Sequence, residues 1–89
     1  MYTVYFSKQA EKDKRMLKAA GYEQKTKELL NILASDPFQT PPPYEALTGN
    51  LKGLYSRRIN IQHRLVYQIL PEDNAVKVLS MWTHYERSR

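Results

Sequence analysis

Apolar side chains recur along the chain with two different periods, which predict a strand followed by two helices. Residues 2–6 are aromatic or β-branched and favour a β-strand. A very polar helix is predicted over residues 7–20, because Ser7 can cap its first turn and Gly21 can end it. A second helix is predicted over residues 22–34, where several side chains fall on one helical face: Tyr22, Thr26, Leu29, Leu30 and Leu33.

The stretch from Tyr55 to Ile69 alternates with the two-residue period of β-strands and predicts a hairpin. Its odd-numbered positions are expected to face the core: Tyr55, Ile59, Ile61, His63, Leu65, Tyr67 and Ile69. Its even-numbered positions are expected to face away from the core: Ser56, Arg58, Asn60 and Arg64. If odd residues pair with odd residues across the turn, Arg58 and Arg64 come close on one face. Like charges in that position repel, so they indicate either an anion site or an ordinary solvated surface.

A last strand is predicted over residues 76–83, after a turn over residues 71–74. Within it, Leu79 and Met81 belong to the core-facing set, and Ser80, Trp82 and His84 to the other set. If this parity is kept across the sheet, His84 lies on the same face as Arg58 and Arg64. The order β-α-α-β-β-β predicts a single two-layer α+β domain over residues 1–89, with both helices on one face of an antiparallel sheet.

A long connection over residues 35–53 joins the helices to the hairpin and contains four prolines. Loops of this length in small domains are usually functional or disordered. Phe38, Tyr44 and Leu47 indicate that this loop is pinned to the body of the domain. The segment Pro41-Pro42-Pro43-Tyr44 also matches a PPxY ligand of WW domains, although a stiff spacer explains the prolines equally well.

The composition fits one small globular domain, with 89 residues of which 42% are hydrophobic. A formal net charge of +5 favours a polyanionic partner, either nucleic acid or an acidic protein segment. The lack of cysteine excludes a disulfide framework and thiol catalysis. No secretory signal and no apolar run of membrane-spanning length are present, so we expect a cytoplasmic protein without a membrane partner.

Glu45, His84 and the arginines of the hairpin are the kinds of group that cleave RNA without a metal. A carboxylate can take the proton from the 2′-hydroxyl, and a histidine can protonate the departing 5′-oxygen. Arginines stabilise the negative charge that builds up on the phosphate, and DNA, lacking the nucleophile, would not be cut. Trp82 and Tyr85 are candidates for stacking on bases. Two histidines 21 positions apart, without cysteine, do not resemble a metal site, and no cofactor is expected.

Several short segments together resemble one family of bacterial toxins. They are Pro43-Tyr44-Glu45-Ala46-Leu47, Gly49-Asn50-Leu51-Lys52-Gly53, Ser56-Arg57-Arg58-Ile59, His63-Arg64-Leu65-Val66-Tyr67 and His84-Tyr85. In these segments the chain resembles the Txe/YoeB family, within the wider RelE/ParE superfamily of type II toxin-antitoxin systems. The N-terminal helical half fits that family in length and order only.

The resemblance implies a RelE-like (microbial RNase-like) fold and an endoribonuclease that cuts mRNA in the A site of the 70S ribosome. A YefM/Phd-like antitoxin would hold the toxin inactive, and a homodimer is a further expectation. The implied roles are Glu45 as general base, His84 as general acid, Arg64 as transition-state stabiliser, Arg58 as phosphate ligand and Tyr85 as substrate-orienting residue, with Arg57 and Trp82 as further substrate-binding candidates. Thr48 stands where family members often have lysine, which removes a cation near the substrate.

Two other classes of function stay open at this point. A ParE-like gyrase inhibitor shares the superfamily fold but binds a protein instead of cutting RNA, and it needs no acid-base pair such as Glu45 and His84. A non-catalytic protein-binding module would use its basic face only to bind an acidic partner. In that case, replacing Glu45 would change nothing.

Overall fold

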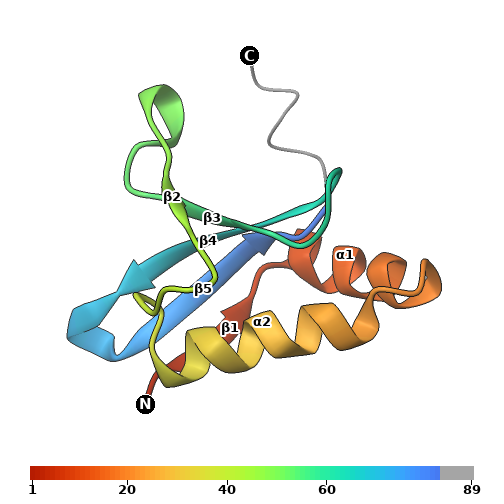
Figure 1. The fold of residues 1–89 in the computed structure, drawn as a ribbon. Coiled ribbons are helices and arrows are strands. Elements are labelled where there is room, and N and C mark those ends of the chain that lie inside the picture. Colours follow the sequence, from red (N-terminus) through yellow and green to blue (C-terminus); the bar gives the residue numbers. More distant parts are fainter. Residues whose placement is uncertain (83–89) are drawn as a thin grey trace.

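Two helices lie on one face of a five-stranded sheet in the computed structural model, which describes residues 1–82 (Figure 1). The elements are β1 (Thr3–Phe6), α1 (Lys8–Ala19), α2 (Glu23–Ser35), β2 (Glu45–Ala46), β3 (Tyr55–Arg58), β4 (Arg64–Leu70) and β5 (Ala75–Ser80), with short 3-10 helices at Gly49–Leu51 and Pro71–Asp73. The predicted two-layer α+β arrangement is confirmed. Over these residues, no helix has the length and apolar character needed to cross a membrane.

Both helices begin and end close to the positions that their sequence signals predict. The Ser7 hydroxyl accepts a hydrogen bond from the backbone N–H of Ala10 at 3.0 Å and so caps α1. Gly21 adopts a φ of 91°, a left-handed conformation that ends the helix at little steric cost for glycine. The α2 helix ends at Ser35, before the Asp36-Pro37 pair that disfavours further helical turns.

The hydrophobic core lies between the helices and the sheet. Leu17 of α1 and Leu29 and Leu33 of α2 are almost fully buried. The sheet and the residues beside it contribute the other side of the core: Ile59, Leu65, Tyr67, Val76, Val78 and Met81. The helix α1 is very polar and contributes Ala10 and Leu17 to this core.

The strand order is β1-β5-β4-β3-β2, and the sheet is mixed. Strands β3, β4 and β5 pair antiparallel as predicted, and β2 adds an antiparallel strand beside β3, but β1 runs parallel to β5. This corrects the prediction of a wholly antiparallel sheet. Exposed and half-buried residues alternate along β1, which shows the face that is covered, but this alternation does not determine the direction of a partner strand some seventy residues away in the chain. The two-residue strand β2 also lies inside the connection predicted to be a loop.

The hairpin formed by β3 and β4 has the predicted register, in which Arg58 lies opposite Arg64. His63 is 6% exposed, which confirms its predicted packing. Ile61 is 89% exposed, so its prediction as a core residue was wrong. The reason is that the chain between β3 and β4 forms a connection, where strand alternation no longer applies.

An irregularity in the pairing of β4 with β5 changes which side chains face the core. Val76 and Val78 pair with Ile69 and Tyr67, so the core-facing set here is even-numbered, contrary to prediction. The register then shifts between Val66 and Tyr67, as at a β-bulge, which re-aims the following side chains. Beyond the shift, Met81 enters the core as predicted.

Tyr67 provides a pH-dependent contribution to stability because its ring is fully buried in β4. Burial raises the pKa of Tyr67 above its ordinary value of 10.0, while the neighbouring positive charge of Arg57 opposes part of that rise. The unfolded chain therefore ionises this tyrosine first. Its contribution is fully present below pH 10 and is lost as the pH rises through the folded-state pKa.

As the pH rises above the ordinary tyrosine pKa, the free energy of unfolding is expected to decrease less in a Tyr67→Phe variant than in the wild type. At neutral pH the variant is expected to be about 1–3 kcal/mol less stable, because the buried Arg57 Nε loses its acceptor. Urea unfolding at neutral and alkaline pH measures both effects. Tyr5→Phe, which changes a tyrosine that is 56% exposed, is the control. An alkaline loss in Tyr67→Phe as steep as in the wild type would contradict this prediction.

Candidate active site

Glu45 and Arg64 lie side by side because β2 and β4 flank β3. Glu45 pairs with Ser56 of β3, and Arg64 pairs with Arg58 of the same strand. The Glu45 carboxylate accepts a hydrogen bond from Arg64, with 3.1 Å between Oε1 and Nη1. The Glu45 side chain is 64% exposed and the Arg64 side chain only 22%. The carboxylate is therefore accessible to a ligand, while most of the Arg64 side chain is covered by its neighbours.

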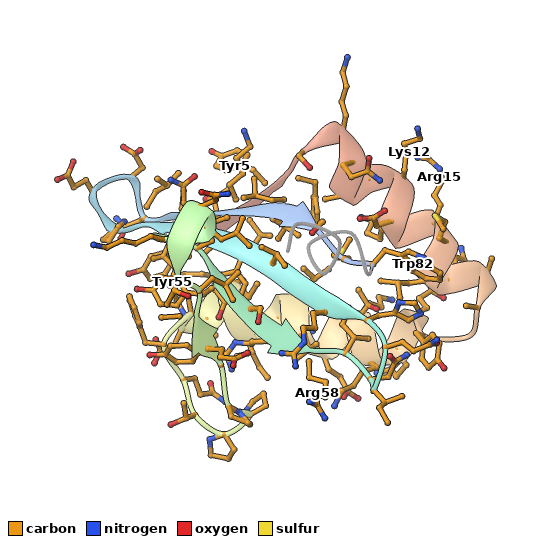
Figure 2. The ribbon with its side chains drawn as sticks, turned by 90° about the horizontal axis from the view of Figure 1, so that it is seen from above. Tyr5, Lys12, Arg15, Tyr55, Arg58 and Trp82 are labelled. Carbon is orange, nitrogen blue, oxygen red and sulfur yellow. The ribbon has the colours of Figure 1, made fainter. Side chains whose placement is uncertain are left out.

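A shallow groove of about 400 Å³ runs over these strands and is lined by Pro43, Tyr44, Glu45, Ser56, Arg58 and Arg64. Arg58 is exposed and lies at one end of β3, with Tyr55 at the other (Figure 2). Two arginines directly opposite each other on a sheet repel, and the ion pair that Arg64 forms with Glu45 brings one negative charge to them. A bound phosphate group would bring further negative charge. The groove thus brings a carboxylate and two cations to the surface that a phosphodiester could occupy.

Arg57 is buried, which corrects its prediction as a substrate-binding residue. Its side chain is 1% exposed, and its guanidinium donates to backbone carbonyl oxygens of the proline-containing loop and to the Tyr67 hydroxyl. The physical reason is the pleat of β3, in which successive side chains point to opposite faces. Arg57 therefore points into the domain where its neighbour Arg58 points to solvent.

Trp82 lies next to Arg64 but is already engaged in packing. Its ring stacks on that of His63, with 3.8 Å between centroids and 23° between planes, and it packs against the hydrophobic core. Its backbone carbonyl accepts a hydrogen bond from the Arg64 N–H at 3.4 Å. One face of the indole is therefore occupied, and stacking of Trp82 on a base stays a prediction.

Ser56, like Pro43 and Tyr44, lines the groove but was not among the predicted site residues. It is 1% exposed, and its hydroxyl has no hydrogen-bond partner among residues 1–82. The available signal was its even parity, which it shares with Arg58 and Arg64. A serine on a strand carries little functional information by itself, because only the pairing of Ser56 with Glu45 places it at the groove.

The predicted general acid His84 and the predicted orienting residue Tyr85 lie outside the residues that the structure describes. Within residues 1–82, no group of three or more histidine, cysteine, aspartate or glutamate side chains is arranged to hold a metal ion. Glu45, Arg58 and Arg64 are thus the members of the predicted site that the structure brings together.

Comparison with known proteins identifies the family. Residues 2–85 match the model of the YoeB-like toxin of bacterial type II toxin-antitoxin systems. The chain is 40% identical over 75 residues to toxin YoeB of Synechocystis sp., a match that covers 84% of this chain and 78% of the relative.

Solved structures agree with this match. A YoeB-YefM toxin-antitoxin complex from Staphylococcus aureus contains a chain 35% identical to this one, with a TM-score of 0.79 and coverage of 96% of this chain and 99% of that one. A YoeB dimer from the same organism is 36% identical, with a TM-score of 0.79 and coverage of 94% and 98%. The chain belongs to the YoeB-like family of toxins of bacterial type II toxin-antitoxin systems.

Proposed function

We propose that this toxin is a metal-independent endoribonuclease that cuts mRNA in the A site of the ribosome. The observation that carries the proposal is the contact between the exposed Glu45 carboxylate and Arg64, in a groove that also contains Arg58. A carboxylate and two guanidinium groups suit a reaction in which a proton is removed while negative charge develops on a phosphate. The site of action would be the cytoplasm, where ribosomes translate.

Glu45 takes the proton from the 2′-hydroxyl of the nucleotide before the cut, and the resulting oxygen attacks the adjacent phosphorus. The bond from phosphorus to the 5′-oxygen breaks, and His84 protonates that oxygen as it leaves. Arg64 stabilises the charge on the phosphate oxygens in the transition state, Arg58 holds the phosphate, and Tyr85 orients the nucleotide. The role of His84 rests on its residue type and on the family resemblance, and the role of Tyr85 on the family resemblance.

The partner of this toxin is proposed to be a YefM-like antitoxin, as in the Staphylococcus aureus complex. An acidic segment of the antitoxin would cover Arg58 and Arg64 and exclude RNA from the groove. Such a complex would weaken as salt is added, because exposed charges are screened. A homodimer is proposed by analogy with the YoeB dimer of the same organism.

Primer-extension mapping of a translated mRNA, with purified ribosomes, tests the activity. Wild type is compared with a variant that carries Glu45→Ala and His84→Ala. Cuts inside codons that require ribosomes and vanish in the variant are the expected result. An intact message in the presence of folded wild-type protein would overturn the proposal, and gyrase inhibition would then be assayed. Equal cutting by both proteins would retain the activity but reject the site.

Thr48 provides a separate test of how RNA is held. It follows Glu45 by three positions and lines a neighbouring open groove together with Lys52 and Tyr55. Thr48→Lys is expected to bind the ribosome–mRNA complex more tightly at low salt and to steepen the logarithmic salt dependence by about 0.7, as one added phosphate contact would. Thr48→Gln, which adds length without charge, is the matched control. The same salt dependence in the two variants would show that no phosphate lies within reach of position 48.

A further inference from the structure

Arg57 is a cation enclosed in the domain without a carboxylate partner among the ion pairs formed by residues 1–82. Its guanidinium instead makes four hydrogen bonds to neutral oxygens. Nε donates to the Tyr67 hydroxyl at 3.1 Å, and Nη2 donates to the carbonyl oxygens of Pro37 and Gln39, each at 2.9 Å. Nη1 donates to the carbonyl oxygen of Pro42.

An apolar side chain of similar volume would fill this space without the desolvation that a buried charge requires. Packing alone therefore does not account for an arginine at position 57. Three of its four acceptors belong to the loop between α2 and β2, far from Arg57 in sequence. The arginine thus joins the middle of β3 to a loop that has no helix or strand of its own between residues 36 and 44.

This loop has few other ways to be held by its backbone. Pro41, Pro42 and Pro43 have no N–H group, so over these residues the carbonyl oxygens are the only polar backbone atoms available for anchoring. The Arg57 guanidinium, with its fork of donors, is suited to hold several carbonyl groups at once. It also lies over the ring of Tyr44, with 5.0 Å between Cζ and the ring centroid.

Glu45 follows these anchored residues directly. It lies one residue after Tyr44 and three after Pro42, and the strand that it begins, β2, pairs with β3 over only two residues. Two register pairs alone are a weak constraint on an exposed carboxylate. The loop that Arg57 holds is therefore a further constraint, besides the pairing of β2 with β3, on where the Glu45 carboxylate lies relative to Arg64.

We propose that Arg57 is a positioning residue, which acts through the proline-containing loop to hold the Glu45 carboxylate against Arg64. The two adjacent arginines of β3 then have different tasks on opposite faces of the strand. Arg57 holds the loop and Glu45 in place from inside the domain, and Arg58 contacts the substrate in the groove. This inference rests on the proposed function, in which Glu45 is the general base.

Single-turnover cleavage by the Arg57→Met and Arg57→Lys variants tests the proposal. Arg57→Met is expected to cut about 10²-fold more slowly, which is the effect of misplacing a catalytic group by about 1 Å, with unchanged binding to the ribosome. Arg57→Lys, which keeps a donor, is expected to recover part of the rate. A wild-type rate in a folded Arg57→Met variant would overturn the proposal. If Arg57→Met does not fold, a wild-type rate in Arg57→Lys overturns it.

A double-mutant cycle separates positioning from general stabilisation. If Arg57 acts through Glu45, its replacement is expected to have no further effect on the cutting rate of a Glu45→Gln variant. If replacing Arg57 lowers the cutting rate by the same factor in the wild-type and the Glu45→Gln backgrounds, the proposal is overturned. Leu17→Ala, which leaves a cavity in the core beside α1 and not at the helix that leads into the loop, shows what lost stability does by itself and is expected to retain the wild-type rate below its unfolding temperature.

Proteolysis keeps this inference distinct from the proposed function. Chymotrypsin can cut the loop after Phe38 and after Tyr44, and Arg57→Met is expected to be cut there several-fold faster than wild type or Leu17→Ala. Equal rates of cutting would overturn the anchoring role of Arg57 even if the protein cleaves RNA. If wild type does not cleave RNA but the variant loop is cut faster, the proposed function fails and the anchoring role stands.

Discussion

A Glu45→Gln variant is expected to cut ribosome-bound mRNA about 10²–10⁴-fold more slowly than wild type, the usual range for loss of a general base. Glutamine keeps the shape of the side chain and can still accept a hydrogen bond from Arg64, but it cannot take up a proton. The loss is expected in the rate of the chemical step and not in binding to the ribosome. Single-turnover primer extension at saturating toxin concentration measures that rate.

Stability and a matched carboxylate provide the controls for this prediction. Glu45 is 64% exposed, so its replacement is expected to change the free energy of unfolding by less than about 1 kcal/mol. Glu72→Gln removes a carboxylate from the turn between β4 and β5, outside the groove, and is expected to leave cutting unchanged. A Glu45→Gln variant that cuts at the wild-type rate would reject Glu45 as the base.

Replacing Arg64 with alanine is expected to slow cleavage by about 10²–10³-fold, the loss usually seen when one donor to a developing oxyanion is removed. The guanidinium would contact the phosphate most strongly in the transition state, where the oxygens carry the most negative charge. The ion pair that Arg64 forms with Glu45 is partly exposed and contributes at most about 1 kcal/mol to stability. The variant is therefore expected to fold, and its defect to lie in the rate.

Arg15→Ala is the matched charge control for Arg64. Lys12 and Arg15 project from α1, well apart from Arg58 (Figure 2). Losing one positive charge there is expected to alter the salt dependence of ribosome binding at most. An equal loss of cutting in Arg15→Ala and Arg64→Ala would mean that overall charge attracts the toxin to the ribosome and that Arg64 has no special role in the reaction.

Local signals in the chain determined the helices and the hairpin. The hydroxyl of Ser7 and the left-handed Gly21 set the ends of α1, because both act on backbone atoms within a few residues. The two-residue alternation of the hairpin placed Arg58 opposite Arg64 for the same reason, since its register depends on residues close in sequence. These elements could be predicted without knowledge of their surroundings.

The same alternation gives Arg57 a position that faces the core. Position 57 is odd-numbered, like Tyr55 and Tyr67. Arginine side chains are mostly exposed, however, so the residue type predicts contact with solvent and substrate. A buried arginine is stable only where several acceptors converge on it. Those acceptors are carbonyl groups of a distant loop, which alternation along β3 cannot reveal.

Only the tertiary structure decided the long-range relations. The parallel pairing of β1 with β5 joins residues some seventy positions apart, and the shifted register beside Val66 interrupts the regular pairing of β4 with β5, which alternation along one strand does not reveal. The contact of Glu45 with Arg64 depends on the short strand β2, which no periodicity over two residues can predict. By itself, then, the sequence determined the elements and the residue types of the site. The approach of distant segments determined the geometry of the site, because hydrogen bonds and packing between them depend on the whole chain.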